Sequence, residues 1–482
     1  MRIIGRKREK DVLSNCLSSG RPEFVVIYGR RRVGKTYLIK EFFKGQFTFY
    51  STGLSDEKTA GQLKAFQASL RIYGSTEKTI PKDWFEAFTR LRELISNDQV
   101  YRDPASGRRV IFLDELPWMD TVRSDFRSAL EYFWNSWASS QEDLLLIVCG
   151  SATSWIIKHM LKDRKGFHNR ITRRIRLLPF SLKECEELLE NNDVVLPRGQ
   201  TIECYMVFGG IPYYLNMIDP RLSLAQNIDE LMFKAYGGLK DEYTELFHSL
   251  FKKPEKHMAI IEALGTRKAG MERGELLDAT GMTNSGGFTS KLEELEECGF
   301  IRKYQAYGKE KKNAAYQLID SFVLFHYKFL AKRPSDERYW SNQENTPARN
   351  AWTGVAFERV CLQHLGEIKR ALGISGVLTD VSTWSCVADP ERGINGSQID
   401  LLIDRRDQVI NLCEMKYSTQ EYSITKEVDA AVRHKVNDFH VVTGTKSAIH
   451  VTFVTPYGLA RNSYAGNVQS EITAEDLFRT LD

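Results

Sequence analysis

The stretch "FVVIYGRRRVGKTYLIKEF", residues 24–42, decides the fold of the first part of the chain. A run of apolar residues is followed by a glycine-bounded basic loop and then by a helical pattern. The spacing GxxxxGK[ST] is met by Gly29, Gly34, Lys35 and Thr36. Backbone N–H groups in such a loop, together with the helix N-terminus behind it, can cradle phosphates. The stretch therefore predicts a nucleotide-binding loop at the end of a strand in a parallel α/β sheet.

The residues of this loop form the core of the predicted nucleotide site. Lys35 is expected to reach the β- and γ-phosphates, and the Thr36 hydroxyl to hold Mg²⁺. The alternative, a chance glycine-rich turn, is disfavoured because a strand precedes the loop and a helix follows it. Nucleotide contacts are assigned to Gly29, Arg30, Arg31, Arg32, Val33, Gly34, Lys35, Thr36 and Tyr37.

Two further strands end in residues that suit nucleotide hydrolysis. In "RRVIFLDELPWM", residues 108–119, four apolar residues precede Asp114 and Glu115. We expect Asp114 to bind Mg²⁺ and Glu115 to activate water. The alternative is a solvated acidic turn. In "LLLIVCGSATSW", residues 144–155, Ser151 stands where a sensor of the γ-phosphate would lie, although a helix N-cap explains it equally well.

Arginines follow in "DRKGFHNRITRRIRLLPF", residues 163–180. Arg170, Arg173 or Arg174 is a candidate arginine finger, with Arg170 and Arg173 preferred, acting within one chain or from a neighbouring subunit. The second possibility requires a homo-oligomer. The alternative is that each arginine is a solvated surface charge.

Composition, together with the residues that break helices and strands, indicates the class of protein and its division into segments. A chain of 482 residues with 42% hydrophobic and 27% charged residues is expected to form two to four domains. The apolar runs are too short for a membrane span, the charged start lacks a signal peptide, and eight cysteines without a CxxC pair argue against zinc or a disulfide scaffold. These features predict a cytoplasmic protein. The predicted segments are a P-loop core (1–180), a helical lid (181–250), a winged helix (251–330), a linker (331–350) and a second α/β domain (351–482).

The winged-helix prediction rests on three helical stretches and a β-hairpin between residues 254 and 320. DNA binding is the obvious hypothesis for such a unit. However, the third helix carries four glutamates, at 293, 294, 296 and 297, against the single Lys291. Phosphates would repel that helix, so we favour a structural or regulatory role. Five basic wing residues remain candidates for contact with a nucleic-acid backbone: Arg302, Lys303, Lys309, Lys311 and Lys312.

A second constellation lies in "IDLLIDRRDQVINLCEMKYS", residues 399–418. Side chains alternate along a strand, so Glu414 and Lys416 share one face. A hairpin would bring Asp400 beside Glu414, where both can bind a divalent metal while Lys416 acts on the attacking water and the phosphate. Glu358, in the apolar helix "WTGVAFERVCLQHL", needs a buried partner that the metal site would provide. The alternative is a surface ion pair between Glu414 and Lys416.

Several of these motifs carry a family resemblance. The stretches "IIGRKREKDVL", "LDELPWM", "CGSATSW", "NRITRRIRLLPFS" and "FGGIPYYL", with the loop, resemble archaeal-type ATPases of the AAA+/STAND division over most of residues 1–330. The resemblance implies ATP and Mg²⁺ as cofactors, with Ile4, Gly5 and Arg6 near the adenine and Gly210 and Pro212 as further candidates for the adenine side. It implies an arginine finger at Arg170, although Asn169 stands where the family usually has glycine. Glu358, Asp400, Glu414 and Lys416 resemble the PD-(D/E)xK restriction-endonuclease-like family.

Together these patterns predict an ATP-hydrolysing protein that couples its nucleotide state to a metal-dependent nuclease-like domain. Its expected partner is nucleic acid, with DNA as the first expectation, contacted by the C-terminal domain and the wing. Defence or mobile-element control is the expected setting. The alternative is a signalling or regulatory ATPase whose tail is a non-catalytic binding module. A chaperone-like or structural ATPase would leave the C-terminal constellation without a role.

Overall fold

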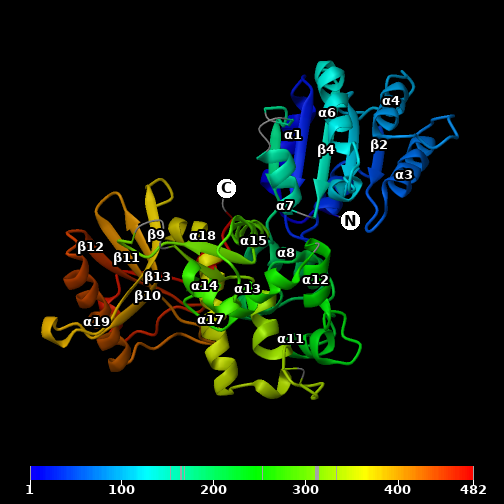
Figure 1. Cartoon of the computed structure of the whole chain (residues 1–482). Coiled ribbons are helices and arrows are strands. Elements are labelled where there is room, and N and C mark those ends of the chain that lie inside the picture. The colour runs from blue at the N-terminus through cyan, green and yellow to red at the C-terminus, as the bar shows by residue number, and fades with distance from the viewer. Residues whose placement is uncertain are drawn as a thin grey trace. The chain divides into compact units, whose positions relative to one another are not determined.

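The computed structural model describes residues 2–151, 153–162, 166–167, 169–251, 253–309, 314–332 and 334–480 (Figure 1). The chain forms two compact units, one of residues 1–179 with 249–252, the other of residues 180–248 with 253–482. Across the described ranges, the structure contains no helix with the length and apolar character needed to span a bilayer.

The first unit is built on a five-stranded parallel sheet in the order β2-β3-β4-β1-β5. This confirms the predicted parallel α/β sheet. Its strands are β1 (Glu23–Tyr28), β2 (Phe49–Thr52), β3 (Arg109–Asp114), β4 (Leu144–Gly150) and β5 (Arg173–Arg176). Its helices are α1 (Lys7–Ser18), α2 (Lys35–Phe42), α3 (Thr59–Ile72), α4 (Trp84–Ile95), α5 (Leu116–Met119), α6 (Phe126–Ser136) and α7 (Thr153–Ile156), the last continued by a π-helical turn, Ile157–Leu161.

An aromatic core covers one face of this sheet. Alternate residues of the central strands, such as Ile111 and Leu113, point into it, as the pleat of a strand requires. Helices α3, α4 and α6 supply large side chains, among them Phe66, Trp84 and Phe126. Because all strands are parallel, their carboxyl ends meet at one edge, and that edge receives the residues that follow β1, β3 and β4.

The second unit begins with helices. They are α8 (Leu182–Asn191), α9 (Arg198–Phe208), α10 (Pro212–Leu215), α11 (Leu224–Ile228), a π-helical turn (Asp229–Phe233) and α12 (Glu242–Leu250). Three helices and a small sheet follow, namely α13 (Glu255–Gly265), β6 (Met271–Glu272), α14 (Arg273–Thr280), α15 (Gly286–Glu297), β7 (Ile301–Tyr304) and β8 (Ala315–Leu318). The antiparallel sheet has the order β6-β8-β7.

Several charges of this segment are engaged inside it. Glu294 of α15 accepts a hydrogen bond from His257 Nε2 at 2.7 Å, so this glutamate faces the helix packing. Arg302 is partly buried and donates to Gln317 at 2.7 Å, while Lys309 pairs with Glu272 at 3.3 Å. Of the basic residues expected on the wing, Lys311 and Lys312 lie outside the described residues, and Arg302 and Lys309 are engaged with neighbours in the same segment.

The polar stretch 331–350 differs from the expected linker. Trp340 is fully buried, and its backbone N–H donates to Asp229 Oδ1 at 2.7 Å. The Arg349 guanidinium lies 4.3 Å from the Trp340 ring centre and 2.5 Å from Glu203 Oε1. The buried tryptophan and the paired arginine fix this stretch to the helices of the second unit. The polar composition of the stretch gives no indication of this packing.

The second unit ends in a mixed five-stranded sheet of order β13-β12-β11-β10-β9. Two antiparallel pairings join β9, β10 and β11, and two parallel pairings add β12 and β13. The elements are α16 (Ser321–Phe325), α17 (Pro347–Gln363), α18 (Leu365–Ala371), β9 (Thr379–Cys386), β10 (Ser397–Arg405), β11 (Val409–Met415), α19 (Lys426–Thr443), β12 (Ala448–Val454), β13 (Ser470–Ile472) and α20 (Ala474–Leu477). Helix α19 makes the crossover that a parallel β11–β12 pair requires.

Candidate functional site

The loop after β1 has the backbone that phosphate binding needs. Gly34 adopts φ 91° and caps the N-terminus of α2. Gly29 adopts φ 148°, and a Cβ atom there would lie 2.2 Å from the carbonyl oxygen of Leu177. Both positions therefore require glycine, one for its left-handed backbone and one for a close approach to the chain after β5.

Lys35 and Thr36 are the first two residues of α2. The Lys35 ammonium is buried and donates to the carbonyl oxygens of Gly29 and Arg30, each at 2.8 Å. The Thr36 hydroxyl donates to Asp114 Oδ1 at 3.1 Å. The loop thus folds around its own lysine, and the hydroxyl and carboxylate expected to share a magnesium ion are in contact.

Asp114 is buried at the end of β3 and held by several donors. Its Oδ1 also accepts from the Cys149 thiol at 2.7 Å and from the Glu115 backbone N–H at 2.9 Å. Burial, and then the charge of Asp114, raises the pKa of the Cys149 thiol well above its usual value. Because the bonds from Thr36, Cys149 and Glu115 all use Oδ1, Oδ2 of Asp114 is the oxygen better placed to bind a cation.

Glu115 begins the short helix α5 in a left-handed conformation, φ 46°. Its Oε1 accepts from the Ser151 hydroxyl at 2.7 Å, and its Oε2 accepts from the Ser151 backbone N–H at 3.1 Å. Ser151 follows β4, so the residue predicted as a sensor instead grips the predicted water-activating carboxylate. The sequence pattern predicts that Glu115 and Ser151 both follow strands at the carboxyl edge of the sheet, but it does not predict their contact.

The N-terminal residues approach the loop from another side. Gly5 and Arg6 both have left-handed backbones, with φ 56° and 54°, and the Arg6 guanidinium donates to the Val33 carbonyl at 3.2 Å. Gly210 and Pro212 belong to the second unit, where Gly210 accepts from the Phe180 N–H at 2.6 Å. Their place beside an adenine stays a prediction.

The predicted arginine fingers have different surroundings. Arg173 pairs with Val25 near the start of β1, and its guanidinium lies 3.8 Å from Glu23 Oε1. It therefore lies at the amino edge of the sheet, opposite the loop, and cannot act as a finger within its own chain. Arg170 is exposed. Arg176, which was not among the predicted fingers, ends β5 beside Tyr28 at the loop edge.

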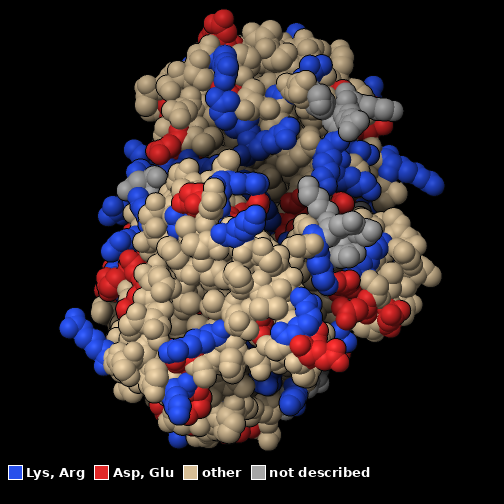
Figure 2. All heavy atoms as spheres, turned by 90° about the vertical axis from the view of Figure 1, so that its left-hand side faces the viewer, with Lys and Arg blue, Asp and Glu red and all other residues tan. Residues whose placement is uncertain are grey.

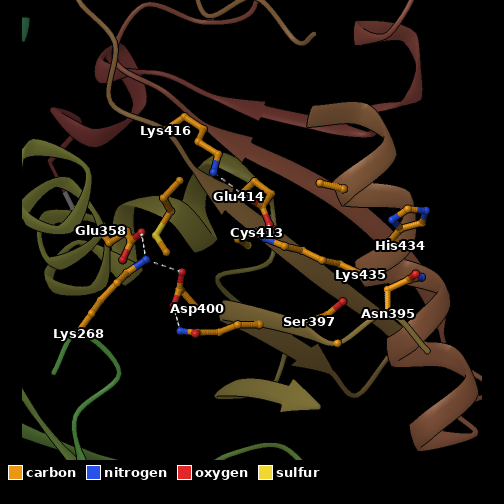
Figure 3. A pocket seen from close by; sticks show the side chains of 14 residues that line it. Lys268, Glu358, Asn395, Ser397, Asp400, Cys413, Glu414, Lys416, His434 and Lys435 are labelled. Atoms are coloured by element: carbon orange, nitrogen blue, oxygen red, sulfur yellow. Dashed lines mark hydrogen bonds and ion pairs between the residues drawn. The ribbon is translucent and has the colours of Figure 1, made fainter. Parts of the chain in front are cut away.

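The C-terminal sheet gathers the other predicted residues. The β10–β11 register pairs Leu401 with Cys413, so the next pair outward is Asp400 opposite Glu414. Cβ atoms of such a pair lie about 5 Å apart. A cavity of about 380 Å³ opens here, and helix α17 contributes Glu358 to it (Figure 3). Its lining residues are Lys268, Glu358, Asn395, Gly396, Ser397, Gln398, Asp400, Cys413, Glu414, Met415, Lys416, Ala431, His434 and Lys435.

Lysines neutralise the carboxylates of this cavity. Lys416 Nζ lies 3.3 Å from Glu414 Oε2, and Lys435 of α19 donates to Glu414 Oε1. Lys268 Nζ lies 2.8 Å from Glu358 Oε1 and 3.3 Å from Asp400 Oδ2. Among the described residues no three His, Cys, Asp or Glu side chains gather into a metal cage. A magnesium ion, which commonly takes only one or two carboxylates, would complete its shell with water and substrate oxygens.

Glu358 carries an unsatisfied oxygen. It is only 7% exposed, and within the described part of the chain its Oε2 has no hydrogen-bond partner. Burial, and then the charge of Asp400, raises the pKa of Glu358, which Lys268 only partly offsets. A buried carboxylate oxygen without a donor is costly, and a cation or its bound water at this point would satisfy it. Asp400 and Glu414 are therefore the two candidate carboxylate ligands for a magnesium ion, and the unsatisfied Glu358 oxygen could accept a hydrogen bond from a water on that ion.

Lys268 and Lys435 were not predicted as site residues. Lys268 lies in a turn far from Glu358 in sequence, and no local pattern connects them. Lys435 had a usable signal, because Val432, Val436 and Phe439 place one face of α19 against the sheet and Lys435 lies beside that face.

The first unit's parallel sheet, glycine loop, Lys35 and acidic strand end define a P-loop nucleoside triphosphatase. Residues 4–218 match the family model described as an ATPase domain predominantly from Archaea. Over these residues the chain is similar to archaeal-type ATPase domains.

Three similar proteins extend this comparison. An uncharacterized protein of Methanocaldococcus jannaschii is 22% identical over 423 residues, 86% of this chain and 87% of the relative. The Walker-type ATPase of Pyrococcus abyssi has a TM-score of 0.49 at 18% identity, covering 68% of this chain and 96% of that one. The Aeropyrum pernix ORC2 protein, in ADPNP–ADP complexes, has a TM-score of 0.41 at 14% identity, covering 69% and 94%.

Proposed function

We propose that the chain binds and hydrolyses ATP with Mg²⁺ and couples its nucleotide state to a metal-dependent nuclease-like site in the second unit. The observation that carries the second half is the convergence of Glu358, Asp400, Glu414 and Lys416 on one cavity. The similarity to the M. jannaschii protein extends over 86% of the chain, which supports the proposal that the two units function together.

The nucleotide half follows from the contacts at the sheet edge. Lys35 would exchange its loop carbonyls for phosphate oxygens, and Thr36 with Asp114 would hold the magnesium ion. Glu115 is the proposed base that takes a proton from the attacking water. Residues 1–180 are the proposed ATPase core and 181–250 its proposed lid.

The nuclease-like half follows from the order of elements. Helix α17, three antiparallel strands, the crossover helix α19 and the parallel strand β12 support a restriction-endonuclease-like domain over residues 351–482. Asp400 and Glu414 would hold the metal, which supplies Lewis-acid polarisation of a phosphodiester. Lys416 would orient the attacking water, and the unsatisfied oxygen of the buried Glu358 would accept a hydrogen bond from a water bound to the cation.

Nucleic acid, with DNA first, is the proposed substrate. Figure 2 shows one face of the molecule, where basic side chains lie in separate groups among acidic ones, in keeping with the net charge of +4. Contacts to the phosphate backbone would therefore be local and salt-sensitive. The segment 251–330 is the proposed winged helix, with a structural or regulatory role because its third helix is acidic. Defence or mobile-element control would suit such an activity.

A second candidate is a signalling or regulatory ATPase whose tail binds without cleaving. The observation that favours it is that Glu358, Asp400 and Glu414 already have lysine partners. In that case the cavity is a neutralised polar pocket, and the chain needs no second metal.

Nicking of supercoiled plasmid by the full chain separates the two candidates. Wild type, Asp400→Ala and Lys35→Ala would each be incubated with Mg²⁺ or Mn²⁺, with and without ATP. The nuclease proposal expects wild-type nicking, none from Asp400→Ala, and nicking by Lys35→Ala that no longer responds to ATP. ATP hydrolysis without any nicking would favour the binding-module alternative.

A further inference from the structure

Lys268 reaches the candidate site from outside the C-terminal sheet. It lies in the turn between α13 and β6, and its ammonium joins Glu358 of α17 to Asp400 of β10 (Figure 3). The second oxygen of Asp400, Oδ1, accepts from Gln398 at 2.8 Å. One lysine thus supplies the positive charge shared by the two carboxylates.

The turn that presents Lys268 is held by its backbone. The Lys268 carbonyl accepts from Arg359 Nη2 at 2.5 Å and from Gln317 Nε2 at 2.7 Å. Arg359 is only 2% exposed and stands next to Glu358 in sequence, so the helix that carries the carboxylate also grips the turn.

The neighbouring residues fix the same turn. The Tyr304 hydroxyl donates to the Ala269 carbonyl. Gly270 has φ 80°, and a Cβ atom there would lie 2.2 Å from the carbonyl oxygen of Tyr316. The backbone of Lys268, Ala269 and Gly270 is held by these contacts, so the turn itself sets the position from which the Lys268 side chain extends. A solvated lysine that meets a carboxylate by chance lacks such constraints.

The charges define what Lys268 does there. The buried Glu358 and the partly exposed Asp400 repel one another, and a positive group between them stabilises both in the ionised form. A divalent cation bound to the same oxygens would be repelled by the ammonium. Lysine and metal therefore exclude one another at Asp400, the carboxylate that both would bind.

We infer that Lys268 is the resident counter-cation of this site, that it competes with the divalent cation for Asp400, and that metal loading requires its ammonium to move away. The inference rests on the proposed function, from which it takes the metal. It gives the segment of residues 251–330 a direct hold on the site, because the lysine that must move belongs to that segment.

Calorimetric titration of the nucleotide-free full chain with Mn²⁺ tests the competition. The variants are Lys268→Met, which keeps the side-chain length without the charge, and Lys256→Met, a control at an exposed position on α13. Asp400→Asn identifies the heat that belongs to this site. We expect Lys268→Met to bind Mn²⁺ about tenfold or more tightly than wild type, the effect of removing one adjacent charge. Lys256→Met should match wild type.

Thermal unfolding provides a second readout. Without metal, Lys268→Met should melt below wild type because its carboxylates lack a counter-charge, and Mn²⁺ should raise its melting temperature more than that of wild type. Equal Mn²⁺ affinity in folded wild type and Lys268→Met would overturn the inference and leave the metal site standing. Absence of Mn²⁺ binding in every variant would overturn both the inference and the proposed nuclease function.

Discussion

The Ser151 hydroxyl donates to Glu115 Oε1 at 2.7 Å while the backbone N–H of the same serine donates to Oε2 at 3.1 Å. Ser151, the first residue after β4, therefore binds both carboxylate oxygens of Glu115, the first residue after β3. This two-point grip fixes the orientation of Glu115 at the carboxyl edge of the sheet. It makes Ser151 a positioning residue for the proposed base.

Ser151→Ala should lower the turnover number for ATP hydrolysis about tenfold with little change in KM. The reason is that one hydrogen bond to a charged group, worth about 1.5 kcal/mol or more, is lost from the base and none from the nucleotide. Steady-state kinetics, with Glu115→Gln as the fully impaired reference, measure this. Ser151→Thr keeps the hydroxyl and should restore turnover, and a Ser151→Ala enzyme with wild-type turnover would remove Ser151 from this role.

Lys35→Ala should weaken ATP binding on the order of 10²-fold, because a charged donor to phosphate oxygens is worth up to about 3 kcal/mol. Fluorescence titration with a labelled ATP analogue measures the affinity. Lys40→Ala on the same helix is the control, since Lys40 lies over the Tyr50 ring, 4.5 Å from its centre, and away from the loop. If the two variants bind equally well, the loop assignment fails.

Arg170→Ala and Arg173→Ala should behave differently. Arg173 is engaged with Glu23 at the amino edge of the sheet, so its loss should leave turnover near wild type. If Arg170 acts on a neighbouring subunit, its loss should lower turnover on the order of 10³-fold. Wild-type specific activity should then rise with protein concentration. A concentration-independent rate that Arg170→Ala does not change would identify Arg170 as a surface charge.

The fold of the first unit and one pairing in the C-terminal sheet could be predicted because their signals are local in sequence. The strand, loop and helix of residues 24–42 are contiguous, and Asp400 and Glu414 lie on one hairpin, so strand alternation alone brings them to one face. Glu358 was identifiable because an acid in an apolar helix needs a partner.

Contacts between distant segments could not be predicted in this way. Lys268 meets Glu358 only because Arg359 and Gln317 anchor its turn, and nothing near Lys268 in sequence encodes that. Trp340 is buried inside a stretch whose polar composition indicates a linker. The distance of Arg173 from the loop could not be predicted, because its position depends on the strand register, which sets it beside Val25.

His364 should make the stability of the second unit depend on acid. It is buried, its Nε2 accepts from the Leu182 N–H at 3.0 Å, and burial lowers its pKa to about 4. An unfolded histidine has a pKa near 6.5, so the unfolded chain binds a proton first as the pH falls. The free energy of unfolding should therefore decrease from about pH 6.5 down to about pH 4, by roughly 3 kcal/mol in all.

Denaturant unfolding at a series of pH values checks this. His364→Gln should show a shallower pH dependence than wild type by up to about 1.4 kcal/mol per pH unit, the contribution of one proton. His440→Gln, an exposed position on α19, should keep the wild-type slope. Parallel curves for all three proteins would show that His364 does not titrate on unfolding.

The two lysines on Glu414 provide the sharpest test of the nuclease-like site. Lys416 shares the strand face of Glu414, whereas Lys435 reaches the same carboxylate from α19. If Lys416 acts on the water and phosphate, Lys416→Ala should abolish plasmid nicking yet retain Mn²⁺ binding, because it removes no metal ligand. Asp400→Ala and Glu414→Ala should lose both. Lys435→Met should keep nicking within a few-fold of wild type, because Glu414 remains free to bind the metal. Equal loss of nicking in Lys416→Ala and Lys435→Met would mean that the lysines serve only to neutralise Glu414, and a nicking-competent Lys416→Ala protein would remove Lys416 from the chemistry.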